Sequence, residues 1–267
     1  MGSLALTAKP SYRAPFEPMP GGVEHIPATI EALEAALDDR VAAVFVEPIQ
    51  GEAGVVELPE GYLAAARSLT LKHGALLIVD EIQTGAGRTG EWFGYNHEGI
   101  TPDAITLAKG IAGGFPIGAL VTFGAASELL TPGSHGSTFG GNPLATAVAN
   151  AVLGEIEHAG LVENAATRGA QLRTLISGLG SPLVDEVRGR GLLIGVGLTA
   201  AGAGQVVAAA QARGLIINAA NPSTVRLAPA LNIGDAEIEE FQTLFAAALA
   251  DVQASLVASE TRKVPAS

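Results

Sequence analysis

Apolar residues follow two alternating patterns along the first 158 residues. Short continuous apolar runs, of the kind that a parallel sheet buries on both faces, predict strands at 41–47, 75–80, 104–108 and 117–122. Apolar positions at helical spacing predict helices at 29–39 and 61–73, the second closed by Gly74. Strands that alternate with helices predict an α/β fold with a mainly parallel sheet flanked by helices. Residues 1–28 hold five prolines and little periodicity, and predict an extended lead-in.

A further helix begins at Asn142-Pro143, where an asparagine can cap the first turn and a proline fits it. One side of this helix carries apolar residues at helical spacing: Leu144, Val148, Val152 and Ile156. The pattern of apolar and polar residues changes after about residue 160. That part predicts helices through Leu172 and Ile176 and at 205–213, and strands at 192–198 and 225–228.

A long closing helix is capped by Asp235 and turns four apolar residues inward: Ile238, Phe241, Phe245 and Leu249. We therefore expect a smaller α+β domain to follow the α/β domain. The predicted boundaries are 1–158 for the major domain with its linking helix, 159–258 for the small C-terminal domain, and 259–267 for a tail.

Composition narrows the function classes. The net charge of −12 argues against nucleic-acid binding, because the sequence has no basic stripe to displace counterions from a phosphate backbone. The absence of cysteine excludes disulfides and thiolate metal sites and fits a cytoplasmic protein. No uninterrupted apolar stretch reaches the length that spans a bilayer, so no membrane partner is expected. The five histidines are scattered without ligand spacing, which disfavours a metal enzyme.

Two residues near strand ends carry candidate chemistry. Lys109 lies in apolar, glycine-rich sequence just after a predicted strand, where desolvation would lower its pKa and make it an amine nucleophile. Asp80 lies at the carboxyl end of the clearest parallel strand, where ligand crevices of open α/β sheets form. A carboxylate there can pair with a protonated ring nitrogen. Taken singly, a lysine extending out of a loop and an aspartate capping a turn explain these residues equally well.

Two glycine-rich segments need separate interpretations. Residues 135–143 place hydroxyl groups and glycine backbone before a helix start, which suits an anion such as phosphate but also fits an ordinary helix cap. Residues 85–90 match the dinucleotide pattern G-x-G-x-x-G. Gly94 interrupts any helix after them, and the next strand leads to Lys109 rather than to an acid. We therefore reject a nicotinamide site.

Together these stretches resemble the class III (fold type I) pyridoxal-phosphate (PLP) aminotransferases, and among them most closely the acetylornithine aminotransferases. The resemblance covers residues 40–235, in family order and at family spacing, and is carried by Glu47–Gly54, Asp80–Gly85 with Gly87–Gly90, Leu107–Gly110 with Gly113–Gly118, His135–Pro143 and Val225–Leu231.

The resemblance implies cofactor-binding roles for five residues. Lys109 would hold PLP covalently and move a proton between the substrate Cα and the cofactor. Asp80 would pair with the pyridine nitrogen, and Gln83 would hydrogen-bond the phenolic oxygen. Ile82 would pack against the ring face, and Glu81 is included with them as a cofactor-binding residue.

The resemblance also implies substrate contacts and a partner. Thr138 would reach the phosphate of the neighbouring subunit's cofactor, which implies a homodimer, and Ser137 would lie near the substrate. Arg226 would bind the substrate α-carboxylate, and Glu52 would pair with Arg226 when no dicarboxylate is bound. The implied reaction transfers the amino group of N-acetylornithine to 2-oxoglutarate in arginine biosynthesis. An ornithine or 4-aminobutyrate aminotransferase stays open as an alternative.

Family members also carry a phosphate cup of the Ser/Thr-Gly-Ala-Glu-Ala type and a Phe-His-Gly-Arg element, and neither occurs in residues 1–267. We therefore expect an amino-terminally truncated chain. The loss of three charge-assisted hydrogen bonds to phosphate would weaken cofactor binding by about 5–9 kcal/mol. An alternative of another class is thus an inactive fragment that retains only a dimerisation surface.

Overall fold

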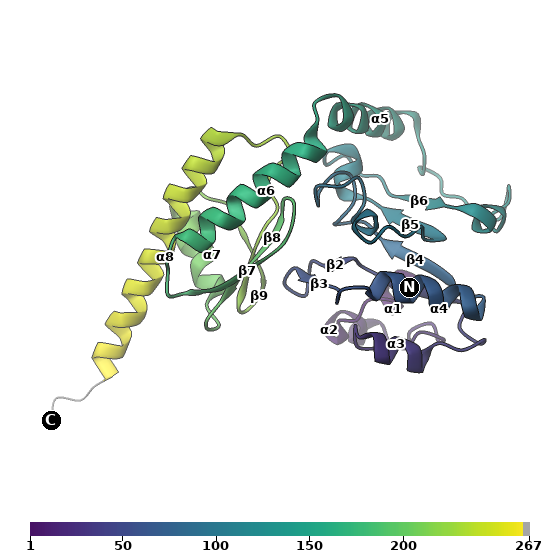
Figure 1. The fold of residues 1–267 in the computed structure, drawn as a ribbon, viewed down its shortest axis with the longest axis horizontal. Coiled ribbons are helices and arrows are strands. Elements are labelled where there is room, and N and C mark those ends of the chain that lie inside the picture. Colours follow the sequence, from purple (N-terminus) through teal and green to yellow (C-terminus); the bar gives the residue numbers. More distant parts are fainter. Residues whose placement is uncertain (264–267) are drawn as a thin grey trace.

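The computed structural model describes the backbone of residues 1–263 and the side chains of residues 1–258. Two lobes follow each other along the chain (Figure 1). We call residues 1–158 the amino-terminal lobe and residues 159–263 the carboxyl-terminal lobe. The two are joined where α5 (Pro143–His158) gives way to α6 (Leu161–Gly178).

The amino-terminal lobe is built on a four-stranded sheet in the order β1 (Ala43–Val46), β4 (Leu76–Asp80), β5 (Ala104–Leu107) and β6 (Ala119–Thr122). The first three strands are parallel, and β6 runs antiparallel to β5. The central strands are continuously apolar because both faces of the sheet are covered, and Leu77, Val79 and Ile105 are fully buried there. The predicted α/β architecture with a mainly parallel sheet is confirmed.

Helices cover both faces of this sheet, with α5 on one side and α3 (Ile30–Ala36) and α4 (Tyr62–His73) on the other (Figure 1). Their ends follow the predicted caps. The Asn142 side chain accepts a hydrogen bond from the Ala145 amide at 3.0 Å, and Gly74 ends α4 in the left-handed conformation. Short elements complete the lobe: α1 (Gly2–Ala5), α2 (Pro10–Arg13), β2 (Ile49–Gln50), β3 (Val56–Glu57), and the 3-10 turns η1 (Ala14–Phe16), η2 (Gly94–Glu98), η3 (Lys109–Ala112) and η4 (Gly124–Glu128).

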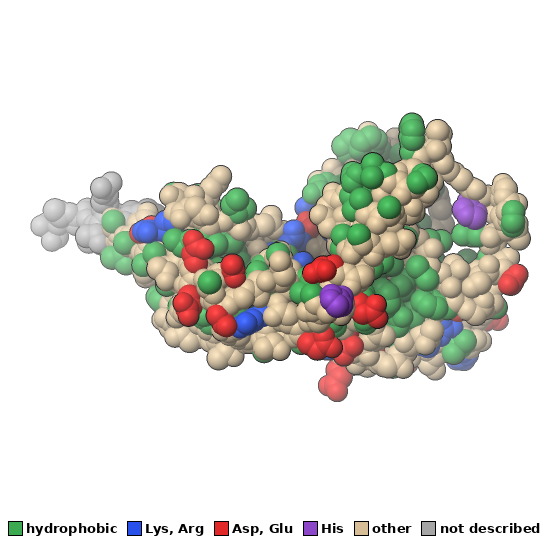
Figure 2. Space-filling model, turned by 90° about the horizontal axis from the view of Figure 1, so that it is seen from above, with side chains coloured by type: hydrophobic (Ala, Val, Ile, Leu, Met, Phe, Trp, Pro, Cys, Tyr) green, Lys and Arg blue, Asp and Glu red, His purple; other side chains and the backbone are tan. Residues whose placement is uncertain are grey.

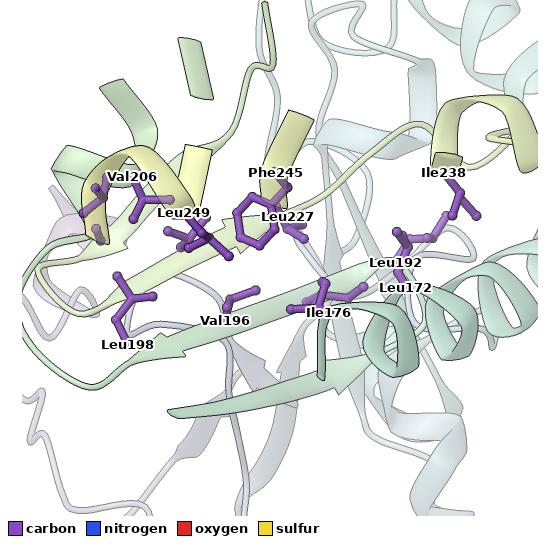
Figure 3. Packing of buried hydrophobic residues seen from close by; sticks show 14 of the residues in the cluster. Leu172, Ile176, Leu192, Val196, Leu198, Val206, Leu227, Ile238, Phe245 and Leu249 are labelled. Carbon is purple, nitrogen blue, oxygen red and sulfur yellow. The ribbon is translucent and has the colours of Figure 1, made fainter. Parts of the chain in front are cut away.

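The carboxyl-terminal lobe holds an antiparallel sheet in the order β7 (Val184–Arg190), β8 (Leu193–Leu198), β10 (Thr224–Leu227) and β9 (Asn218–Asn221). The helices α6, α7 (Ala203–Ala212) and α8 (Asp235–Lys263) pack against it. Every residue of β8 is buried. Figure 3 shows why: side chains from all three helices and from β10 meet those of β8, among them Ile176, Val206, Leu227, Phe245 and Leu249.

The helix α8 has the length and apolar composition that could cross a membrane, with a mean hydropathy of 1.3 in an 18-residue window within Asp235–Ala258. Length and composition alone are weak evidence. One side of α8 lies in the core of the carboxyl-terminal lobe, where Ile238, Phe245 and Leu249 are 2%, 0% and 1% exposed. The predicted inward face of this helix is therefore confirmed. The helical backbone continues to Lys263, into the predicted tail at 259–267, and residues 264–267 lie outside the described residues.

Three local expectations are wrong. The lead-in at residues 1–28 contains α1, α2 and η1 rather than only extended chain. Leu144 does not join the buried side of α5: its side chain is 62% exposed, whereas Ile156 is 3% exposed. The expected cap at Asp235 is wrong because α8 begins at Asp235 itself, whose side chain pairs with Arg168. In addition, the strands β2, β3, β7 and β9 were not predicted: the first two are two residues long, β7 is interrupted by charged residues and a glycine, and β9 begins and ends with asparagine.

Candidate active site

Asp80 and Lys109 lie at the same edge of the amino-terminal sheet. Asp80 is the last residue of β4 and pairs in parallel register with Thr106, and Lys109 follows two residues after the end of β5. This is the carboxyl edge, where open α/β sheets bind ligands. Asp80 Oδ1 accepts a hydrogen bond from the Ile82 amide at 2.9 Å, so Asp80 does cap the turn that follows β4. Within residues 1–258, Asp80 Oδ2 has no hydrogen-bond partner and is left for a ligand.

The backbone at Lys109 is in an unusual conformation. Its φ is 45°, in the left-handed region that side chains other than glycine rarely adopt. Such strain costs about 1–3 kcal/mol and concentrates at functional sites. Lys109 is exposed, and its amine makes no hydrogen bond or ion pair with the described part of the chain. The loop therefore presents an exposed amine, and the expected desolvation of Lys109 is wrong for the described part of the chain.

Glu47 interacts electrostatically with both Asp80 and Lys109. No role was predicted for it from the sequence. It follows directly after β1, the strand next to β4. Burial raises the pKa of the Glu47 carboxyl, the nearby Asp80 carboxylate raises it further, and the positive charge of Lys109 opposes both. Asp80 and Lys109 thus both lie within electrostatic reach of Glu47. Glu47 follows the carboxyl end of a predicted parallel strand, as Asp80 does, and this position is the sequence signal for it.

A second group joins the two lobes. Arg226 Nη1, on β10, donates to Glu52 Oε1 at 2.7 Å and to Gln83 Oε1 at 3.1 Å. Gln83 Nε2 in turn lies 3.4 Å from Glu52 Oε1. The Arg226 guanidinium lowers the pKa of Glu52, and Lys109 contributes to the same shift from farther away. The structure therefore brings together Glu52, Gln83 and Arg226, and Lys109 lies within electrostatic reach of Glu52.

Arg88 fixes this arrangement from the loop that follows Gln83. Its guanidinium donates to the carbonyl oxygens of Leu192 at 3.1 Å and Pro229 at 2.6 Å, both in the carboxyl-terminal lobe. Burial lowers the pKa of Arg88 to about 10. Because Pro229 lies three residues after Arg226, this contact holds the end of β10 against the loop that carries Gln83.

The side chain of Glu81 points into the interior of the protein. Its side chain is 1% exposed, and its oxygens accept hydrogen bonds from the Thr84 hydroxyl, from the Gly94 amide at 2.8 Å and from the Tyr95 amide at 2.9 Å. Both oxygens are thus used inside the protein, which conflicts with the expectation that the Glu81 side chain binds a cofactor. Its neighbour Ile82 is half-buried, and the predicted packing of Ile82 on a ring stays a prediction.

Ser137 and Thr138 are not part of this group. The segment that carries them leaves from the end of β6, and the pairing of Thr122 with Ala104 places that end at the amino-terminal edge of β5. This edge is opposite to the one with Asp80 and Lys109. Both residues are exposed, and Ser137 Oγ accepts a hydrogen bond only from the nearby Gly140 amide at 3.2 Å among the described residues. Their predicted contacts with a neighbouring subunit's cofactor and substrate stay predictions.

Comparisons with known proteins agree with this geometry. The family described as aminotransferase class-III matches residues 1–249. The chain belongs to the class III aminotransferases. It is 56% identical over 250 residues to the acetylornithine aminotransferase of Mycolicibacterium smegmatis, a match that covers 93% of this chain and 64% of that protein.

Solved structures of class III aminotransferases share the fold. An ornithine aminotransferase from Toxoplasma gondii, whose active site holds PLP at partial occupancy, matches with a TM-score of 0.88 and 38% identity, over 93% of this chain and 61% of that one. The N-acetylornithine aminotransferase of Stenotrophomonas maltophilia matches with a TM-score of 0.79 and 38% identity, over 85% and 62%. The chain spans 60–64% of the length of the curated relatives.

Membership of class III implies PLP, and the residues at the carboxyl edge fit one end of this molecule. Among the described residues, Asp80 Oδ2 has no partner, as a protonated pyridine nitrogen requires, and the Lys109 amine has none either, as the aldehyde carbon requires. Gln83 lies beside them with a side-chain amide that can reach a phenolic oxygen. The described residues therefore fit the ring and aldehyde of PLP. The segment that carries Thr138, the predicted ligand of the neighbouring subunit's phosphate, leaves from the opposite edge of the same sheet.

Proposed function

We propose that this chain carries the lysine and carboxylate side of an aminotransferase site that takes nitrogen from N-acetylornithine and passes it to 2-oxoglutarate. The observation that carries the proposal is the convergence of Lys109, Asp80 and the Arg226–Glu52 pair at one sheet edge. The names of the similar acetylornithine aminotransferases support the choice of donor. Such a reaction belongs to arginine biosynthesis.

The proposed cofactor- and substrate-binding residues come from both lobes. PLP, when bound, supplies the electrophilic carbon and the electron sink that the chain lacks. Lys109 holds the cofactor and moves a proton to or from the substrate Cα. The negative charge of Asp80 keeps the ring nitrogen protonated, an effect that shifts such a pKa by about 1–3 units. Gln83 orients the ring oxygen.

Arg226 supplies the positive charge for a substrate carboxylate. Arginine suits this role because its planar guanidinium matches a carboxylate with two parallel hydrogen bonds. Glu52 occupies the same guanidinium in the present structure, so a substrate carboxylate must displace it. A dicarboxylate such as 2-oxoglutarate brings a second negative charge that competes better for the arginine. Glu52 therefore helps one site accept an amino donor and a dicarboxylate in turn.

We also propose a homodimer. The segment between β6 and α5, together with the first turn of α5, exposes large apolar side chains: Leu129 is 61%, Phe139 is 82% and Leu144 is 62% exposed. Figure 2 shows hydrophobic side chains gathered over the amino-terminal lobe on the face that carries α5. Apolar surface of this kind typically marks an interface. A cytoplasmic location is a further proposal, supported by the absence of cysteine from the sequence.

The same exposed segment favours a second candidate, in which the chain contributes a dimerisation surface without catalysis. The experiment that separates the two is a panel of amino donors. The purified chain is incubated with PLP, 2-oxoglutarate and N-acetylornithine, ornithine or 4-aminobutyrate, and glutamate is measured. The proposed function predicts the fastest glutamate formation with N-acetylornithine and none with Lys109→Ala.

Turnover that survives Lys109→Ala would contradict the proposal. Preference for ornithine or 4-aminobutyrate would keep the reaction and change the substrate. Glutamate formation that occurs only in mixtures with a full-length relative, together with co-elution of the two chains in size-exclusion chromatography, would favour the second candidate.

A further inference from the structure

Three residues form a row across the sheet of the carboxyl-terminal lobe. Gly195 on β8 pairs with Arg188 on β7 and with Arg226 on β10. Residues directly opposite each other in antiparallel strands point to the same face. Arg188 and Arg226 therefore stand on one face of the sheet, on either side of a residue that has no side chain. Both are well covered, with 21% and 17% of their side chains exposed.

The segment Gly51–Val55, which we call the Glu52 loop, lies on this row. A Cβ atom at Gly195 would be only 2.9 Å from the carbonyl oxygen of Gly54 and 3.0 Å from Cβ of Val55. Glycine at position 195 thus permits the close approach. The loop is itself unusual, since Gly54 and Val55 have φ of 114° and 57°, and Val55 is fully buried.

Each residue from 52 to 55 is held by a side chain of the carboxyl-terminal lobe. Arg226 binds the Glu52 carboxylate. Asn221 Nδ2 donates to the carbonyl oxygen of Ala53 at 2.8 Å. Arg188 donates to the carbonyl oxygen of Gly54 from Nη2 at 2.6 Å and from Nε at 3.0 Å, and to that of Val55 from Nε at 3.1 Å.

The Arg188 side chain is itself held in place by further contacts. Its Nη2 also donates to Thr224 Oγ1 at 3.0 Å, and its Nη1 pairs with Glu186 on the same strand. A guanidinium held at several points presents its remaining donors in a defined geometry, so less conformational entropy is lost when the loop binds. We propose that Arg188 is a positioning residue, which docks the Glu52 loop on the sheet beside Arg226 and thereby keeps Glu52 within reach of that arginine. This inference rests on the proposed function, because it concerns how Glu52 competes for the carboxylate-binding Arg226.

The Glu52 loop is held by the carboxyl-terminal lobe, although its residues lie between two strands of the amino-terminal lobe. Without Arg188, the loop loses the donors to two successive carbonyl groups. The Glu52 carboxylate would then sample positions away from Arg226. Arg226 would be free more often, and discrimination between a dicarboxylate and an amino donor would weaken.

Hydrogen–deuterium exchange of the Glu52 loop tests this inference without cofactor or turnover. The amides of Gly54 and Val55 both donate to the carbonyl oxygen of Gly51 at 3.3 Å, so their exchange reports loop opening. Arg188→Gln should speed their exchange by about tenfold or more, because hydrogen bonds to a charged group are lost. The matched control is Arg213→Gln, which removes an ion pair between Arg213 and Asp251 at 2.7 Å elsewhere in the same lobe.

Two further measurements separate positioning from general stability. Arg188→Lys keeps the charge and one donor direction, and should restore part of the protection. Carbon NMR of the Glu52 carboxyl should show its pKa rising in Arg188→Gln toward the ordinary glutamate value, because the carboxylate leaves Arg226. Unchanged exchange of Gly54 and Val55 in Arg188→Gln, or an equal increase in Arg213→Gln, would overturn the inference. Because neither readout uses PLP, a failure of the proposed reaction leaves this test unaffected.

Discussion

Arg226 and Glu52 are separated by 174 residues, yet Nη1 of the one lies 2.7 Å from Oε1 of the other across the boundary between the lobes. The arginine side chain is 17% exposed and the glutamate side chain 61%. The pair therefore joins a fixed, covered cation to an anion that reaches out of a loop. Such an anion can be displaced by a ligand at small cost, because exposed ion pairs are worth only about 0.2–1 kcal/mol.

Glu52→Gln should consequently tighten the binding of 2-oxoglutarate by about 1.5- to 5-fold, since it removes the charge that competes for Arg226. The dependence on pH follows from the lowered pKa of Glu52. The ion pair is fully present above the ordinary glutamate pKa and is lost as the pH falls through the lowered value. Wild-type affinity should thus rise toward that of Glu52→Gln only in this acidic range. Titration calorimetry measures both effects, with the exposed Glu31→Gln as control. Weaker binding by Glu52→Gln would contradict the competition.

Glu81 is predicted to stabilise the fold rather than to bind a ligand. Glu81→Ala leaves the amides of Gly94 and Tyr95 without acceptors, at a cost of about 1–3 kcal/mol each. Burial raises the pKa of Glu81. A carboxyl with a raised pKa contributes stability that is present below the ordinary value of 4.5 and is lost as the pH rises through the raised value. Wild type should therefore lose stability relative to Glu81→Gln as the pH rises from 4.5.

Urea unfolding between pH 4.5 and 7 measures both Glu81 variants. The exposed Glu91→Gln provides the control and should follow wild type at every pH. A free energy of unfolding for Glu81→Ala that equals wild type would show that the three hydrogen bonds do not hold the segment between β4 and η2.

Two glycines within helices should respond oppositely to alanine. A Cβ at Gly169 in α6 would overlap the carbonyl oxygen of Gly191, at the turn between β7 and β8. Gly169→Ala should thus lower the free energy of unfolding by about 1–3 kcal/mol through overpacking. A Cβ at Gly154 in α5 would meet no atom within 4 Å. Gly154→Ala should raise the same quantity by about 0.5–1 kcal/mol, because alanine favours the helix. Equal effects in thermal unfolding would refute the close packing at Gly169.

The elements that define the fold are readable from the sequence because their physics is local. Continuous apolar runs predict β1, β4 and β5, and the central strands β4 and β5 hold the buried residues Leu77, Val79 and Ile105. Asn142 and Gly74 marked helix ends through side-chain capping and the left-handed conformation. The position of Asp80 and Lys109 at one edge followed from parallel pairing, since the carboxyl ends of neighbouring parallel strands meet there.

The parts that escaped prediction depend on contacts between distant segments. Asp80 and Glu81 are adjacent, but one faces the ligand edge and the other the interior, and no local signal separates them. Leu144 has the right spacing for the buried side of α5, yet nothing in the described structure covers its place in the first turn. The row of Arg188, Gly195 and Arg226 requires the register of three antiparallel strands, which the turns and the packing set.

The proposed site requires Lys109 and Asp80 to act on one bound molecule, and trapping of PLP on lysine tests this directly. The chain is mixed with less than one equivalent of PLP, reduced with borohydride, and mapped by peptide mass spectrometry. Four lysines compete: Lys9, Lys72, Lys109 and Lys263. We predict that the adduct forms predominantly on Lys109 and that Asp80→Asn lowers its yield there. An adduct spread over the other lysines, or a yield at Lys109 that Asp80→Asn leaves unchanged, would contradict the account.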